Sequence, residues 1–152
     1  MPPGTSERQA TASWVTVCPV TESGTESAAE AFDRPTLELL RSQREVDLES
    51  SRAAGSTPHR ATIWVVVDPA DRVFIRSLRG EEGRWYRDVV ANPTCVLHLA
   101  EREMPVIAVA AADPEQVEAC SRALVAKYGN RASTASMLMA ETLPTTLRLL
   151  PR

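Results

Sequence analysis

The sequence has few of the residues that usually carry redox, metal or nucleophilic chemistry. It contains three cysteines and two histidines in 152 residues. Cys18, Cys95 and Cys120 form no Cys-x-x-Cys pair, and together with His59 and His98 they give no metal-binding spacing. We therefore expect no metal site. An odd number of cysteines without a paired pattern also indicates a reducing, cytoplasmic setting.

Several catalytic and membrane signatures are missing as well. There is no Gly-x-Gly-x-x-Gly turn, no Gly-Lys-Ser phosphate loop and no Gly-x-Ser-x-Gly elbow. No hydrophobic run approaches the length of a membrane-spanning helix, and the weakly apolar segment ATASWVTVCPV is short and lacks a basic leader. The net charge of −3 gives no general reason to bind polyanions. We expect neither nucleic acid nor membrane as a partner.

What is present is the composition of a folded domain. Hydrophobic residues make up 43% and charged residues 24% of the chain, which suits one domain with a buried core. Residues 1–31 are rich in Ser, Thr, Glu, Ala, Gly and Pro without sustained periodicity, so they are predicted to be a disordered leader. Residues 32–152 form the second part, the predicted domain.

Hydrophobic patterns in the domain predict a mixed order of helices and strands. A helix should begin after Asp33, which can cap it. Strands follow at 45–50, 61–67 and 72–77, then a short helix that Pro93 ends, strands at 94–100 and 104–111, a helix and a final strand at 145–152. In the short helix, Tyr86, Val89 and Val90 fall on one face. Clustered, hairpin-linked strands with few helices favour an α+β fold with an antiparallel barrel of about six strands.

The last helix is the clearest of the predicted elements. Asp113 can cap it, Pro114 suits its first position and Gly129 should stop it. Its apolar stripe consists of Val117, Cys120, Leu124 and Tyr128. Cys120 is therefore a core residue rather than a nucleophile. His98, in the middle of a predicted strand, is interpreted as a partly exposed structural residue.

The segment SLRGEEGRWYRDVVANP, residues 77–93, gathers unusual residues for an acidic chain. Cations, a hydroxyl and glycine are the natural partners of a phosphate, and here they are Arg76, Ser77, Arg79 and Gly80. A helix that begins near Trp85 would add a positive dipole end. Trp85 and Tyr86 offer flat faces for an aromatic ring. The alternative is that the arginines only pair with neighbouring acids.

This segment also resembles a known group. RWYRDVVANPTCVLHLA resembles the Trp-Tyr-x-x-Leu-x-Ala-Asn-Pro helix and following strand of deazaflavin-dependent nitroreductases, which are split-barrel relatives of pyridoxamine-phosphate oxidase. The longer pattern IWVVV…VFIRSLRGEEGRWYR…ANP…AKYG…TTLRLLPR resembles even more closely a bacterial family of unknown function. The resemblance covers about Phe32 to Arg152. It implies a split β-barrel with flanking helices, and a domain at 32–152 that binds a cofactor.

The resemblance also implies particular site residues. The positions that match the group's cofactor contacts are Arg60, Thr62, Ser77, Arg79, Gly80, Trp85 and Asn92. Arg79 stands where lysine is usual, and Ala61 interrupts the expected Thr-Pro pattern, so both deazaflavin and FMN stay open as the cofactor. Tyr86 is the candidate proton donor, with packing on the helix as the alternative role.

Three functions follow from these residues. The first is an oxidoreductase that delivers hydride from a flavin or deazaflavin to a small unsaturated or nitro-type acceptor. The second is a carrier or sensor that binds the cofactor without turnover. The third is an interaction domain that keeps the barrel with a degenerate site. A homodimer is possible in each case.

Overall fold

The computed structural model describes residues 31–111 and 113–152, so the predicted leader lies outside the described residues apart from Ala31. The strands in this part form a seven-stranded antiparallel sheet. They are β2 (Val46–Ser50), β3 (His59–Ile63), β4 (Val66–Val67), β5 (Val73–Ile75), β6 (Thr94–Leu99), β7 (Arg102–Ala110) and β8 (Leu147–Pro151).

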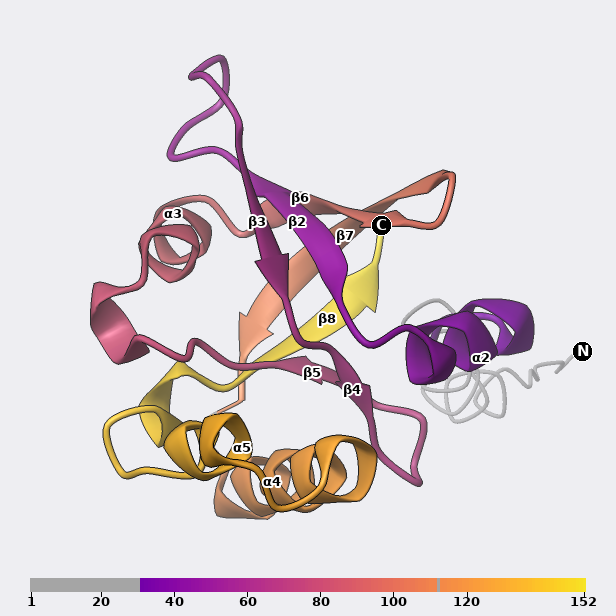
Figure 1. The fold of residues 1–152 in the computed structure, drawn as a ribbon. Helices are drawn as coiled ribbons and strands as arrows, with labels where there is room; N and C mark the ends of the chain where they lie inside the picture. The colour runs from indigo at the N-terminus through magenta and orange to yellow at the C-terminus, as the bar shows by residue number, and fades with distance from the viewer. Residues whose placement is uncertain (1–30, 112) are drawn as a thin grey trace, which may run out of the picture. The chain divides into compact units, whose positions relative to one another are not determined.

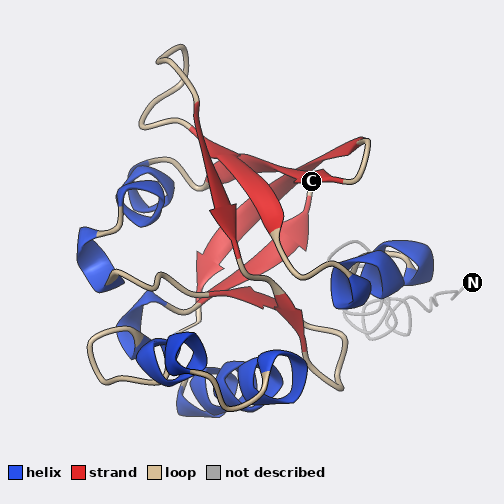
Figure 2. Cartoon of the chain, viewed as in Figure 1, coloured by secondary structure: helices blue, strands red, loops and turns tan. Residues whose placement is uncertain are grey.

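Helices lie around this sheet (Figures 1 and 2). They are α2 (Arg34–Ser42), α3 (Arg84–Ala91), α4 (Pro114–Tyr128) and α5 (Ala132–Met137), with short 3-10 turns η2 (Gly80–Glu82) and η3 (Leu143–Thr145). Figure 1 shows α4 and α5 together below β4 and β5, with α3 and α2 on opposite sides of the sheet.

The order of the strands explains the barrel. The order is β3-β2-β6-β7-β8-β5-β4, so the two edge strands β3 and β4 follow each other in the chain. Only Trp64 and Val65 lie between them. The sheet must therefore curl until its edges are a few residues apart, which gives a half-barrel. The predicted α+β fold with an antiparallel split barrel is confirmed.

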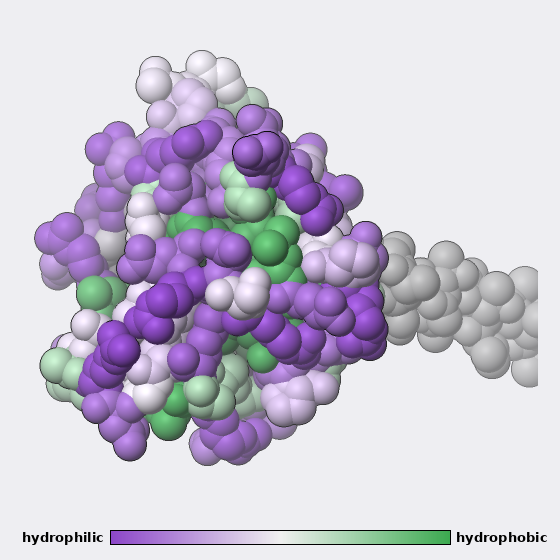
Figure 3. Space-filling view, turned by 45° about the vertical axis from the view of Figure 1, so that its right-hand side comes forward, coloured by the Kyte–Doolittle hydropathy of each residue, from purple (hydrophilic) through white to green (hydrophobic). Residues whose placement is uncertain are grey.

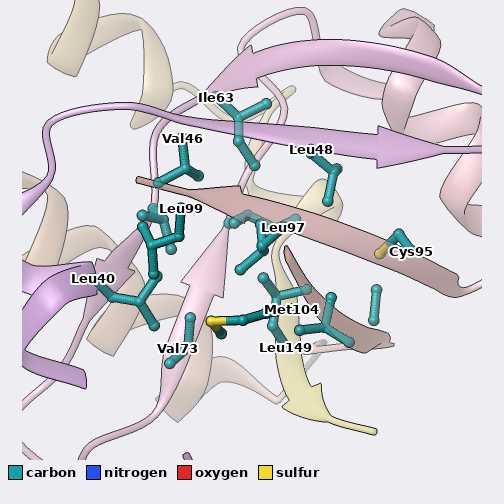
Figure 4. Packing of buried hydrophobic residues seen from close by; sticks show 14 of the residues in the cluster. Leu40, Val46, Leu48, Ile63, Val73, Cys95, Leu97, Leu99, Met104 and Leu149 are labelled. Carbon is teal, nitrogen blue, oxygen red and sulfur yellow. The ribbon is translucent and has the colours of Figure 1, made fainter. Parts of the chain in front are cut away.

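The inside of the half-barrel is the larger core. Alternate residues of β2 and β6 point inward, with Leu48 and Leu97 fully buried (Figure 4). From α2, Leu40 packs into the same cluster. This core is therefore formed by every second residue of the strands and by the apolar face of one helix.

A second cluster lies between β4, β5 and the C-terminal helices. Val66 and Phe74 pack with Cys120, Leu124 and Tyr128 of α4. All three residues of β5 are buried, because this strand has the barrel core on one face and α4 on the other. Burial of Cys120 confirms its interpretation as a core residue.

The predicted elements are mostly confirmed, with three differences. The expected strand 61–67 is two strands, β3 and β4, so the sheet has seven strands. Helix α5 was not predicted. Val90 was expected on the buried face of α3 with Tyr86 and Val89 but is 61% exposed. The cap of α2 is confirmed, since Asp33 Oδ1 accepts a hydrogen bond from the backbone N–H of Thr36 at 3.0 Å. Asp113 occupies the cap position of α4, but its side chain makes no cap hydrogen bond there, so the expected capping by Asp113 is wrong.

The face drawn in Figure 3 is mostly hydrophilic, with small hydrophobic areas between the charged residues. Within residues 31–111 and 113–152, every helix is too short or too polar to cross a membrane.

Candidate functional site

A cavity of about 310 Å³ opens beside the predicted segment, and we call it the tryptophan cavity. Its walls come from β3, the segment after β5, α3 and α5. The lining residues are Glu45, Thr62, Ile63, Trp64, Arg76, Leu78, Trp85, Ser133 and Met137. Residues far apart in the chain therefore meet here, among them three of the predicted cofactor contacts.

Arg76 is the most unusual residue of the tryptophan cavity. It is 2% exposed and directly follows β5. Its guanidinium donates four hydrogen bonds to neutral acceptors: Thr146 Oγ1 at 2.9 Å, Ser121 Oγ at 3.0 Å, and the carbonyls of Met137 at 2.9 Å and Val117 at 3.0 Å. These bonds hold the buried cation in one orientation.

The charge of Arg76 is not balanced by these contacts. Among the described residues it forms no ion pair with a carboxylate. Burial lowers the pKa of Arg76, but a guanidinium stays protonated in proteins. Because the group carries five N–H donors and uses four of them with described residues, one N–H of Nη2 has no partner in this part of the chain. The wall of the tryptophan cavity thus contains a fixed positive charge.

Two tryptophans supply the flat surfaces of the cavity. The ring of Trp64 stacks on Tyr128, with centroids 3.8 Å apart and planes 9° from parallel. Trp85 meets Tyr86 edge to face at 6.2 Å and packs against the barrel core. Since both indoles are held by neighbouring rings, they are rigid walls suited to a planar ligand. Trp64 was missed in the sequence because it lies in an apolar run that reads as an ordinary strand.

The predicted phosphate-binding turn forms a compact structure. The N–H of Gly80 donates to the Ser77 carbonyl at 3.1 Å, and that of Gly83 donates to the Gly80 carbonyl at 3.2 Å. Gly80 has φ +67°, and a Cβ there would lie 3.1 Å from the Glu141 carbonyl oxygen. A Cβ on Gly83 would collide with Ser77 Oγ. The left-handed φ of Gly80 favours glycine, and a side chain at position 83 would force Ser77 to shift.

Ser77 itself is buried with an unused hydroxyl. It is 1% exposed, and its N–H donates to Thr145 Oγ1 at 3.1 Å. Its Oγ has no hydrogen-bond partner among the described residues. A buried hydroxyl without a partner costs free energy. This oxygen is the second group of the segment, after the Arg76 N–H, that has a free hydrogen-bonding position.

Arg79 lies apart from the tryptophan cavity. It is exposed and lines a separate hollow with Gly80, which also contains Glu81, Glu82 and Glu141. An anion held there by Arg79 would lie among three carboxylates, which disfavour it. Arg79 and Gly80, two of the predicted cofactor contacts, therefore lie near both positive and negative side chains.

The other predicted contacts lie at separate places. The Arg60 guanidinium hydrogen-bonds the ring of His98 at 2.9 Å, and His98 Nε2 bonds Glu49 at 2.7 Å. This is the partly exposed structural role expected for His98. Asn92 caps the end of α3 and accepts a hydrogen bond from Thr94 Oγ1 at 3.0 Å.

Tyr86, the predicted proton donor, lines a small hollow with Glu81, Arg87 and Val90. Burial, and then the charge of Glu81, raise the pKa of Tyr86, so its phenol stays protonated at neutral pH. It is not among the residues that line the tryptophan cavity. A role for Tyr86 in proton transfer thus requires that the acceptor reach this hollow.

Other reactive side chains in the described part of the chain are ordinary core groups. Burial raises the pKa of the Cys95 thiol to about 11 and that of Cys120 to about 11. Thiols with these pKa values are poor nucleophiles. No three His, Cys, Asp or Glu side chains of residues 31–111 and 113–152 are placed to share a metal ion.

Comparisons with known proteins show which structures have a similar fold. The structure is similar to HutZ, the heme storage protein from Vibrio cholerae, with a TM-score of 0.57, 14% identity, and 78% of this chain and 89% of HutZ covered. A candidate pyridoxamine 5'-phosphate oxidase from Listeria innocua gives a TM-score of 0.52 at 16% identity, covering 78% of this chain and 90% of that one.

A heme binding protein from Mycobacterium smegmatis gives a TM-score of 0.52 at 10% identity, with 79% of this chain and 52% of that protein covered. Identities this low show the fold alone, which is that of pyridoxamine-phosphate-oxidase-like split barrels. Membership of the deazaflavin-dependent nitroreductase group is not confirmed by these similarities.

A comparison with curated proteins finds no match. The sequence pattern is more specific than the fold, because residues 36–149 match DUF2255, which is described as an uncharacterized protein conserved in bacteria. The predicted resemblance to a bacterial family of unknown function is confirmed, and the chain belongs to the DUF2255 family.

Proposed function

We propose that the tryptophan cavity binds the ring system of a flavin-type cofactor, FMN or a deazaflavin. In this proposal the protein is an oxidoreductase that transfers hydride to a small unsaturated or nitro-type acceptor. The observation that carries the proposal is Arg76, a buried cation without a carboxylate partner among the described residues, in the wall of a cavity with two tryptophans. Because an unpaired buried charge is costly, an anionic ligand group is its natural partner.

The residues of the tryptophan cavity fit such a ring. Its volume of about 310 Å³ is near the lower limit of ligand pockets, roughly 300 to 1,000 Å³, so a ring system fits while a longer tail extends outside. The free N–H of Arg76 would hold an oxygen or nitrogen at the ring edge. Trp64 and Trp85 would hold the ring faces and exclude water, and Thr62 would add a hydroxyl at the rim.

The cofactor, when bound, supplies the hydride chemistry. The chain binds it and sets its orientation. The family resemblance assigns the phosphate-bearing tail to Ser77, Arg79 and Gly80. Arg60 and Asn92 are further proposed contacts outside the tryptophan cavity.

The test is a fluorescence titration of the purified, cofactor-free full chain with FMN and, separately, with a deazaflavin. We expect saturable binding of one of them. Trp85→Ala should weaken it by about tenfold or more, because it removes a stacking surface. Arg84→Ala is the matched control, since Arg84 is an exposed arginine beside Trp85. Binding of neither cofactor, or equal affinity in wild type and Trp85→Ala, would refute this function.

Turnover needs its own measurement. The protein with reduced cofactor is mixed anaerobically with a nitroaromatic compound or a quinone, and oxidation of the cofactor is followed by absorbance. Oxidation that depends on the acceptor and on the protein supports an oxidoreductase. Tight binding without it supports the alternative, a cofactor carrier or sensor.

Tyr86 is the proposed proton donor to the acceptor. Tyr86→Phe removes only the hydroxyl and keeps the ring that packs on Trp85. Cofactor affinity should stay the same while turnover falls. Unchanged turnover would make Tyr86 a packing residue of α3.

Heme is the competing ligand, because two of the similar structures are named for heme storage or binding. An axial ligand is usually His, Cys, Tyr or Met, and of the residues that line the tryptophan cavity only Met137 is of these types. This composition favours a flavin ring over heme. Titration with hemin, followed by the Soret band, distinguishes the two: a sharp shifted band lost in Met137→Leu would favour heme.

A further inference from the structure

A second cavity, of about 640 Å³, lies between α4, the β4–β5 hairpin and the end of α2, and we call it the lysine cavity. Its walls include Val66 of β4 and Ala119, Ala123 and Ala126 of α4. Small aliphatic side chains on both sides leave an apolar trough. It shares no lining residue with the tryptophan cavity.

Most charged groups of the lysine cavity already have partners. Arg72 pairs with Asp68 at 2.7 Å and with Glu115 at 2.8 Å. Arg41 pairs with Asp71 at 2.7 Å. The Asp68 carboxylate also accepts the backbone N–H of Arg72 at 2.8 Å. Arg122, which also lines the lysine cavity, pairs with Glu118 at 3.4 Å. These groups neutralise one another and leave little attraction for a ligand charge.

Lys127 is the exception. Its ammonium donates to the carbonyls of Leu40 at 2.9 Å and Val65 at 2.7 Å, and it lies 5.3 Å from the centroid of the Tyr128 ring. Among the described residues it has no carboxylate partner. An ammonium has three N–H donors, so one of them has no partner within residues 31–111 and 113–152.

We propose that the lysine cavity is a binding site for a small amphipathic monocarboxylate, such as a medium-chain fatty acid, with its carboxylate on Lys127 and its apolar body along Ala123 and Ala126. One unpaired cation with one free N–H suits a single negative charge and one accepting oxygen. An apolar trough of this volume suits a chain rather than a second polar group, and it lies within the range of small-molecule pockets.

The experiment uses the full chain and dodecanoate below its micelle concentration, with dodecan-1-ol as the uncharged analogue, both measured by calorimetry. We expect one saturable site for dodecanoate and weaker binding of the alcohol. Lys127→Met keeps an unbranched side chain that is one atom shorter and removes its charge. It should weaken dodecanoate by about tenfold or more and leave the alcohol unchanged.

A second variant keeps the proposal testable if Lys127→Met does not fold. Ala126 is exposed on α4, so Ala126→Phe fills the lysine cavity from its outer side without entering the core. It should abolish binding of both ligands. Arg131→Met, an exposed cation outside the lysine cavity, is the control and should bind as wild type does. Dodecanoate affinity that is equal in wild type and Ala126→Phe, or equal to that of the alcohol, would overturn the proposal.

Discussion

The tryptophan cavity and the lysine cavity each contain a cation without a carboxylate partner among the described residues, but the two cations are held differently. Arg76 is fixed by four hydrogen bonds within the protein, whereas Lys127 is held by two backbone carbonyls. Indole rings form the walls around Arg76, and alanine and valine form the walls around Lys127.

This difference indicates which ligand each cavity suits. A rigid planar cation between flat aromatic walls matches a planar, polar ring. A flexible point charge above an aliphatic trough matches a chain with one charged end. The two cavities also have a structural link, because Trp64 of the first stacks on Tyr128, the residue next to Lys127.

The largest effect is expected for Arg76→Met. The substitution leaves the acceptors of Thr146, Ser121, Met137 and Val117 without their donor. We expect the free energy of unfolding to fall by about 2–4 kcal/mol. Urea denaturation measures it, with Arg84→Met as the exposed control. A loss below that of the control would mean that Arg76 does not organise this part of the fold.

The next effect concerns Lys127 and pH. Burial, and then the charge of Arg44, lower the pKa of Lys127 from 10.5 to about 8. Between these values the unfolded chain binds more protons than the folded one, so the stability contribution of Lys127 rises with pH. Between pH 8 and 10.5, the free energy of unfolding of wild type should rise by on the order of 1 kcal/mol relative to that of Lys127→Met. This is less than the full pKa shift implies, because the lysine is partly solvated.

The comparison with Lys127→Met is needed because the stability contributions of other groups fall as the pH rises. Cys95 and Cys120 have thiol pKa values raised by burial from 9.0 to about 11, so their stability contribution is lost as pH rises through that range. Both variants share these thiols, and the difference isolates the lysine. A difference that falls with pH would contradict the unpaired, buried state of Lys127.

A smaller effect is expected for Ser77→Ala. Its hydroxyl is buried and has no partner among the described residues, so removal should leave the free energy of unfolding unchanged or raise it by up to about 1 kcal/mol. Affinity for the bound cofactor should fall severalfold, because the tail loses a contact. A variant that loses stability but not affinity would show that Ser77 serves the fold alone.

The smallest effect is expected at the rim of the lysine cavity. Arg41 and Asp71 form an exposed pair, with side chains 37% and 41% accessible. Arg41→Met should change the free energy of unfolding by about 0.5 kcal/mol or less and leave dodecanoate affinity unchanged. A clear loss of affinity in calorimetry would mean that paired cations also attract the ligand, and the contrast with Lys127 would disappear.

Local signals predicted most of the elements but only part of the site. Asp33 at the start of α2 and Gly129 after α4 act within one turn of the chain, and both were correctly interpreted. Helix α5 has six residues and no cap bond from its side chains, so no such signal announces it. It nevertheless brings Ser133 and Met137 to the tryptophan cavity.

The candidate site shows the same limit. The sequence indicated Arg76, Thr62 and Trp85 as binding residues, and the structure brings these three together in the wall of one cavity. Arg79 and Asn92 lie in other hollows, because neighbours in sequence diverge once a turn or a helix end intervenes. Trp64 joins the site only because the strand breaks there, and the pattern of its apolar run contains no sign of that break.

The sequence by itself determined the antiparallel strands, the capped start of α2, the end of α4 at Gly129 and the family, because alternation, capping and motif spacing act between residues close in the chain. Only the tertiary structure decided that the run 61–67 divides between the two edges of the sheet and that Arg76 is buried against α4 and α5. Both depend on the curl of the sheet, which closes contacts between residues up to 70 positions apart. Such contacts arise from packing, and no local pattern encodes them.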